Sequence, residues 1–224
     1  MDVEAFLKRY PRLYHMAEAG SWQQIREEGL LSTSALLDRY EVQGEERRAI
    51  ESRRRPRSVQ LTHPRTGETA VIRDNIPLNE TFLAQVLTDM TPEQWYETLN
   101  RRVFFWVREE KLLVLLNARA YRGRAHDVIT VDTRKLVERH EDRITLAPIN
   151  TGAAFSPTAA KRGSDTFASI QEYPFEELLR WRGSKDVITE LAVDYKVDNI
   201  EDVAIRAETR YRGDVLAALW ERPG

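Results

Sequence analysis

Residues 12–37 read RLYHMAEAGSWQQIREEGLLSTSALL, and this stretch decides the fold. A short apolar run over 13–16 contains one histidine and predicts a buried strand. Apolar spacing predicts a helix over 19–28, and Gly29 is a plausible end because helices often finish with a left-handed residue. The hydroxyl-rich segment 32–34 then offers side chains that cap the next helix. The stretch is therefore a strand, a helix and a polar loop in quick succession.

The composition narrows the class of protein. With 224 residues, 42% of them hydrophobic and 31% charged, the chain is long enough to form one globular domain over 1–224. A net charge of −2 gives no overall signature of nucleic-acid binding. The absence of cysteine excludes disulfides, thiolate catalysis and cysteine-based zinc sites, and it fits a reducing cytoplasm. No long apolar run or secretory signal pattern occurs, so we expect a cytoplasmic protein without a membrane span.

Downstream of the opening unit, residues 41–78 form a charged segment that we interpret as a possible insertion. Alternating residues over 58–62 and 68–73 flank a Pro-Arg-Thr-Gly turn and predict a β-hairpin inside it. The run Arg53–Arg57 is the most basic cluster of the chain. Such runs are most often solvated faces, and the alternative is contact with nucleic-acid phosphates.

The rest of the chain mixes helices and strands without a regular βαβ order. Helices are predicted over 79–88, 92–100, 109–119, 133–140, 175–181 and 214–220, and Thr91-Pro92 gives the second of these a good start. Strands are predicted over 103–106, 127–132, 143–146, 186–193 and 202–207. Residues 148–172 are polar and irregular, which is typical of a binding loop or a lid. We therefore expect an α+β fold with a mostly antiparallel or mixed sheet.

Several common catalytic motifs are absent. The four histidines show no HExxH spacing, so we expect no metal site. The chain also lacks the GxSxG, GxxxxGK[ST] and GxGxxG patterns, which removes the simplest readings as a hydrolase, a P-loop NTPase or a Rossmann enzyme.

A few residues stand out as candidates for chemistry. His15 lies in an apolar strand, where a core histidine with one hydrogen bond is the plain alternative. Ser32 and Thr33 follow a helix end, where capping alone explains them. Glu190 has apolar neighbours on both sides. A carboxylate there costs free energy unless it is paired, used, or turned to solvent on an edge strand.

Arg73 and the aromatic run over 103–106 have two interpretations each. Arg73 ends a predicted strand beside Asp74, as part of either a surface ion pair or a phosphate site. Phe104 and Phe105 are either core residues or rings that stack on a ligand.

Three of these blocks, in this order, resemble the ADP-ribosyltransferase fold. The unit 13–16 with its helix and the Gly-Leu-Leu-Ser-Thr end at 29–33 is similar to the opening of the DarT-type DNA ADP-ribosyltransferases and the RNA 2′-phosphotransferases. Residues 189–193 and 199–205 look like the DarT ending, in which the glutamate is catalytic. The run 103–106 is similar to the second conserved strand of that fold. The whole chain also looks like a bacterial family with LYHM, GLLSTSALL and VFFW blocks.

The resemblance implies a split β-sheet core with peripheral helices, and NAD bound as a substrate in a cleft between two small sheets. It implies that Glu190 and His15 are catalytic, and that His15 also contacts a ribose hydroxyl, with Tyr14 in the same cofactor-binding set. Ser32 and Thr33 would lie beside the nicotinamide ribose, and Phe104 or Phe105 would stack on nicotinamide. Arg73 would bind the pyrophosphate, with Arg102 or Arg119 as substitutes.

The implied activity is NAD-dependent mono-ADP-ribosylation with release of nicotinamide. A toxin-like enzyme of this kind modifies a DNA or RNA base or a protein side chain, and it is often partnered by an antitoxin. With water as the acceptor the protein is an NAD glycohydrolase. The family's usual tyrosine is replaced here by Phe and Trp, which leaves open a non-catalytic NAD-binding or nucleotide-binding module, or a protein-interaction module. A 2′-phosphotransferase needs several basic residues around its phosphate, and this sequence shows no clear set of them.

Overall fold

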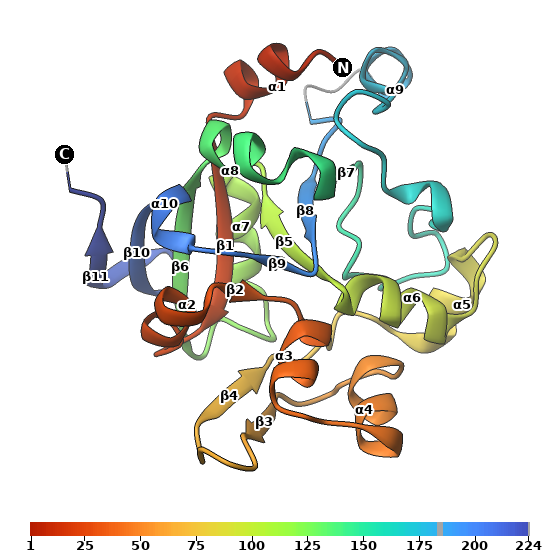
Figure 1. The fold of residues 1–224 in the computed structure, drawn as a ribbon. Helices are drawn as coiled ribbons and strands as arrows, with labels where there is room; N and C mark the ends of the chain where they lie inside the picture. Colours follow the sequence, from red (N-terminus) through yellow and green to blue (C-terminus); the bar gives the residue numbers. More distant parts are fainter. Residues whose placement is uncertain (183–185, 224) are drawn as a thin grey trace.

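The computed structural model describes residues 1–182 and 186–223 of the chain (Figure 1). Seven strands of the described residues form one antiparallel sheet in the order β11-β10-β6-β1-β5-β8-β7. They are β1 (Arg12–Glu18), β5 (Arg102–Trp106), β6 (Ala125–Asp132), β7 (Ile144–Ala147), β8 (Glu190–Asp194), β10 (Ala204–Tyr211) and β11 (Asp214–Glu221). The expected α+β class with an antiparallel sheet is confirmed.

The main sheet is nearly divided between β1 and β5. Strand β1 pairs with β6 along its whole length, whereas its register with β5 in the described residues is a single pair, Tyr14 with Trp106. We call β11-β10-β6-β1 the first half and β5-β8-β7 the second half. A small sheet of β2 (Leu30–Leu31) and β9 (Lys196–Val197) ties together the segments that follow each half. The expected pair of small sheets is thus one large sheet with a split.

Short helices surround the sheet. They are α1 (Val3–Arg9), α2 (Trp22–Glu28), α3 (Thr33–Arg39), α4 (Gly44–Glu51), α5 (Glu80–Val86), α6 (Pro92–Asn100), α7 (Glu109–Leu116), α8 (Thr133–His140), α9 (Phe175–Arg182) and α10 (Ile200–Val203). The largest apolar cluster includes Phe6, Leu13, Phe105 and Leu191, and so spans both halves. Across the described ranges, the helices lack the length and apolar character needed to cross a bilayer.

The opening unit folds as its sequence predicts, and two residues explain its geometry. Gly29 ends α2 with φ of +86°, and a Cβ there would lie 2.7 Å from the carbonyl oxygen of Val197 in β9. Glycine is therefore required both by the backbone angle and by the close approach of β9. Ser32 caps α3, because its Oγ accepts a 3.2 Å hydrogen bond from the Ala35 N–H.

Residues 41–78 contain α4 and the predicted hairpin, β3 (Val59–Thr62) with β4 (Thr69–Ile72). They build an apolar cluster of their own together with Leu37 and Tyr40 of the α3 region. In Figure 1 this unit lies below the main sheet, beside α3.

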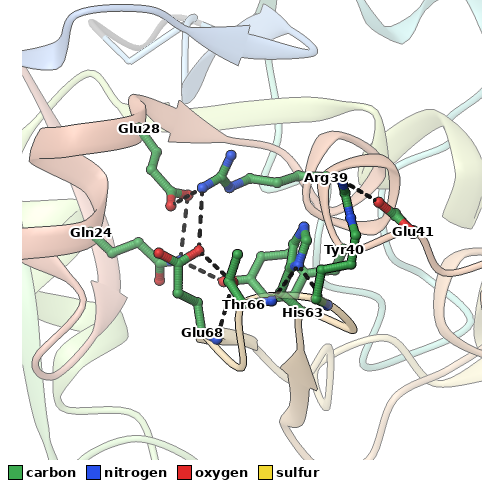
Figure 2. Close-up of polar contacts among 9 residues, drawn as sticks. Gln24, Glu28, Arg39, Tyr40, Glu41, His63, Thr66 and Glu68 are labelled. Carbon is green, nitrogen blue, oxygen red and sulfur yellow. Dashed lines mark hydrogen bonds and ion pairs between the residues drawn. The ribbon is translucent and has the colours of Figure 1, made fainter.

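Polar contacts fasten the hairpin to the opening unit (Figure 2). The guanidinium of Arg39 lies between Glu28 of α2 and Glu68, at 3.7 Å from the latter. Gln24 donates a 2.6 Å hydrogen bond to the Tyr40 hydroxyl. The hairpin is therefore held against α2 and α3.

The basic run Arg53–Arg57 is a solvated face only in part, because Arg53 and Arg57 are exposed whereas Arg54 and Arg55 are turned inward. Arg54 donates to the carbonyl oxygen of Leu78 at 2.8 Å. Arg55 is buried and donates to the Arg73 carbonyl oxygen at 3.1 Å and to Asn100 at 2.9 Å. These two side chains fix the turn that follows α4, so they are not available to phosphates.

Three predicted elements near the C-terminal end were wrong in type or extent. Residues 214–220 form β11 instead of a helix, because Arg212 turns the chain at φ of +59° and the segment pairs with β10. The strand predicted over 186–193 begins at Glu190, and the first residues of the one predicted over 202–207 belong to α10. A tight hairpin with the neighbouring strand β10 thus outweighs the helical spacing of β11, and the other two strands are present with shorter bounds than predicted.

Candidate functional site

A cavity of about 340 Å³ lies where the main sheet is split. It is lined by His15 of β1, Phe104 of β5 and Glu190 of β8, together with Ser32 and Thr33. Its volume is within the range of small-molecule sites, which is roughly 300–1,000 Å³. Residues that lie far apart in the sequence thus line one cavity.

His15 bridges the two halves of the sheet. Its Nδ1 donates a 2.8 Å hydrogen bond to the carbonyl oxygen of Phe104, so the proton is assigned to this nitrogen. Burial lowers the pKa of His15 to about 4, the charge of Arg73 adds to this, and the Phe104 bond opposes it. The ring is therefore neutral near pH 7, and Nε2 is a hydrogen-bond acceptor.

Glu190 is a buried carboxyl at the start of β8, with only 5% of its surface exposed. Burial raises its pKa to about 7, although two hydrogen bonds from Thr151 and the charge of Arg162 act in the opposite direction. Oε2 accepts from the Thr151 N–H at 3.1 Å and from its hydroxyl at 2.7 Å. No hydrogen bond from the described residues reaches Oε1, so this oxygen is available to a ligand.

The two phenylalanines of β5 differ in environment. Phe105 is fully buried in the main core and its ring centroid lies 5.6 Å from that of His15, so it offers no free face for stacking. Phe104 is partly exposed, lines the cavity, and lies tilted against Phe167. Both residues are among those that line the cavity, but only Phe104 is partly exposed, which makes it the better candidate for stacking.

Tyr14 does not line the cavity, which corrects its place among the predicted site residues. Side chains alternate along a strand, so Tyr14 faces away from its neighbour His15. It packs with Leu112 and Leu116 of α7 in a separate apolar cluster.

Ser32 and Thr33 lie at the start of α3. Ser32 is buried, and its hydroxyl caps α3, as the capping interpretation of the sequence predicts. Thr33 is less buried and also lines the cavity.

Arg73 lines the cavity and is anchored to the first half of the sheet. It donates to the Met16 carbonyl oxygen at 3.1 Å and its guanidinium lies 5.0 Å from the Tyr121 ring centroid. Its Nε and Nη2 are enclosed and have no hydrogen-bond partner among the described residues, and burial lowers its pKa. Nε also lies 3.9 Å from Glu18 Oε2, so the ion-pair alternative holds in part, with Glu18 as the partner and with both side chains largely buried.

The two substitutes for Arg73 separate clearly. Arg102 lines the cavity, but it donates to the Thr98 carbonyl oxygen at 2.5 Å and lies over the Phe167 ring at 4.5 Å. Arg119 is exposed and does not line the cavity.

The loop over 148–172 contributes residues that the sequence did not single out. Thr151 bonds Glu190, and the buried Arg162 bonds the carbonyl oxygens of Thr151 and Ala153 at 3.2 and 2.8 Å. Isolated bridges fasten the loop at three points, pairing Ala154, Arg162 and Ala168 with other segments. The loop lines the cavity and is fastened to other segments, which agrees with the binding-loop alternative for this segment rather than with the lid.

The cavity combines a neutral acceptor, a carboxyl that titrates near neutrality and a partly exposed aromatic ring. Such groups suit a ligand with hydroxyls and a planar ring. In the part of the chain that the structure describes, no three His, Asp or Glu side chains form a group able to hold a metal ion.

No curated protein and no solved structure matches this chain. One protein family does, over residues 11–204. That range runs from just before β1 to the first residue of β10 and contains every cavity residue named above. The chain belongs to this family, which is described as a family of unknown function, DUF7002.

Proposed function

We propose that this protein has an ADP-ribosyltransferase-like fold and transfers ADP-ribose from NAD with release of nicotinamide. The observation that carries the proposal is the cavity at the split, where His15, Phe104 and Glu190 come from three different strands. These are the strands on which the resemblance to the DarT-type branch rests. If the fold is shared, the three blocks should meet at one cavity, and their meeting here supports the proposal.

In the proposed reaction, the ionised form of Glu190 accepts a hydrogen bond from the 2′-hydroxyl of the nicotinamide ribose. The bond between C1′ and the nicotinamide nitrogen breaks, and nicotinamide leaves with the bonding electrons. Positive charge develops on the ribose, and the nearby carboxylate stabilises it. The acceptor then forms a bond to C1′ and loses a proton to solvent or to Glu190.

Other cavity residues bind the substrate in this proposal. Neutral His15 offers Nε2 to a ribose hydroxyl of the adenosine half. Phe104 presents a ring to nicotinamide. Arg73 is the candidate for the pyrophosphate, because it lines the cavity and its Nη2 has no hydrogen-bond partner among the described residues, so that a phosphate oxygen would supply one.

The acceptor is a nucleic-acid base, a protein side chain or water. The nucleic-acid alternative drew on the run Arg53–Arg57, and Arg54 and Arg55 are committed to backbone carbonyls. Arg53 and Arg57 of the same run are exposed, so all three classes of acceptor stay open.

A second candidate is a non-catalytic NAD-binding module. It is favoured by the phenylalanine at the position where the family has tyrosine, and by the raised pKa of Glu190, which keeps part of the population neutral at pH 7.

The test is nicotinamide release from NAD by purified protein, with no acceptor and then with DNA, RNA or mixed protein added. Release without acceptor indicates a glycohydrolase, and release that needs one acceptor class identifies the transferase. Protection of the protein by NAD against thermal unfolding, without release, favours the binding module. If NAD neither binds nor reacts, the proposal is wrong.

A further inference from the structure

The carboxyl of Glu190 is held by a loop residue, Thr151, which belongs neither to β8 nor to its neighbours β5 and β7. Thr151 donates both its N–H and its hydroxyl to Oε2, at 3.1 and 2.7 Å. Its register partners on the neighbouring strands, Trp106 of β5 and Ala147 of β7, form no hydrogen bond with this carboxyl. Within the described residues, no cation forms an ion pair with Glu190. The orientation of the carboxyl thus depends on one residue.

Thr151 is in turn fixed by a buried guanidinium. Arg162 is 2% exposed, and its Nη1 donates to the carbonyl oxygens of Thr151 and Ala153 while its Nε donates to that of Ala160. The backbone of Arg162 is itself anchored, because its N–H donates to the Val86 carbonyl oxygen at 3.0 Å. A guanidinium that bonds three carbonyls of one loop fixes the shape of that loop.

We propose that Thr151 is the positioning residue for Glu190, and that Arg162 sets the position of Thr151 by holding the loop over 151–160. With Oε2 bound to Thr151, Oε1 is left for the ribose hydroxyl of the substrate. This inference rests on the proposed function for its role in catalysis, but the contact itself is independent of NAD. Arg162 does not itself line the cavity, so it acts on Glu190 through Thr151.

The experiment measures the titration of the Glu190 carboxyl by ¹³C NMR on glutamate-labelled protein, with the signal assigned by its loss in Glu190→Gln. Thr151→Val keeps the shape of the side chain and removes the hydroxyl donor. Since that donor stabilises the ionised form, we expect the midpoint to rise by about one pH unit. Thr151→Ser retains the hydroxyl and should keep the wild-type midpoint. Thr166→Val removes a similarly buried hydroxyl from the same loop and should leave Glu190 unchanged.

Turnover provides the second readout. Thr151→Val should lower kcat for nicotinamide release about tenfold at pH 7 with little change in KM, and Arg162→Lys should do the same more weakly. An unchanged Glu190 midpoint in Thr151→Val, or in Thr151→Ala if the valine variant does not fold, overturns the inference. A shifted midpoint in a protein that never releases nicotinamide supports the positioning contact and rejects the proposed function, so the two failures are distinguishable.

Discussion

The two halves of the main sheet present different chemistry to the cavity between them. His15, from the first half, is kept neutral near pH 7 because burial lowers its pKa to about 4. Glu190, from the second half, has its pKa raised to about 7 by the same cause, so it titrates where the histidine does not. Burial disfavours the charged form of both groups, but only the carboxyl becomes sensitive to pH near neutrality. One half therefore supplies a constant acceptor, and the other supplies a group that changes charge.

The largest expected effect comes from removing the charge on the second half. Glu190→Gln keeps the size of the side chain and its acceptor oxygen for Thr151, but it cannot carry a negative charge. We expect nicotinamide release to fall about a thousandfold, because electrostatic stabilisation of the transition state is usually the largest catalytic effect. The matched control is Glu110→Gln, which changes an exposed glutamate in α7. Equal losses in both variants would remove Glu190 from the mechanism.

Glu190 and His15 should also have opposite effects on how stability changes with pH. The folded-state pKa of Glu190 is about 7 against 4.5 for a free carboxyl, so its ionisation lowers the free energy of unfolding as pH rises through this window. Glu190→Gln should therefore gain stability relative to wild type between about pH 4.5 and 7, by up to about 3 kcal/mol. Chemical denaturation at a series of pH values measures this difference. A constant difference would mean that Glu190 is not buried as described.

His15 should change the free energy of unfolding in the opposite direction. Its folded-state pKa is about 4 against an ordinary 6.5, so protonation in this range favours the unfolded chain. The contribution of His15 to the free energy of unfolding should rise between about pH 4 and 6.5, against the falling contribution of Glu190, and His15→Gln should lose this rise relative to wild type. The same denaturation series checks it, and an unchanged slope in the variant would contradict the assignment.

Much of this architecture is predictable from local sequence, because the first half begins with a strong signal. The apolar run over 12–16 and Gly29 gave β1 and the end of α2 correctly. Thr91-Pro92 forms the expected start of α6, with a complete capping box. Such signals work because their physics involves neighbours within a few residues.

The missing parts depend on contacts between distant residues. Thr151 lies 39 positions from Glu190, and no spacing rule connects them. Phe104 and Phe105 are equivalent in sequence, and their difference in exposure depends on the placement of β5 beside the split. The C-terminal segment was wrong for another reason: Val215, Leu216 and Leu219 have helical spacing, but a tight hairpin pairs them with the neighbouring strand β10.

The link between the halves can be weakened at Gly29. Gly29→Ala introduces strain at φ of +86° and places a Cβ 2.7 Å from the Val197 carbonyl oxygen, so β2 and β9 must separate. We expect a loss of about 2 kcal/mol, or roughly 4–8 °C in Tm. Gly20→Ala has a similar φ of +87° but no atom within 4 Å, so it should cost about half as much. Equal melting temperatures for the two variants would show that the close approach is unimportant.

The smallest expected effect concerns the constant acceptor of the first half. His15→Ala should raise KM for NAD about tenfold and change kcat little, because a ribose contact far from the broken bond contributes uniform binding. Steady-state kinetics at pH 7.5 measure the split, with His140→Ala in α8 as a control outside the cavity. A loss confined to kcat would assign His15 a direct part in the chemistry.

The pH dependence of nicotinamide release by the wild-type protein, over pH 5 to 9, tests the central claim most directly. If Glu190 is the catalytic carboxylate, the rate rises with a midpoint near pH 7 and is level above it, since His15 stays neutral throughout. The background is set by Glu190→Gln at each pH. Absence of release above that background at every pH, or a rate that does not rise through pH 7, would contradict the account.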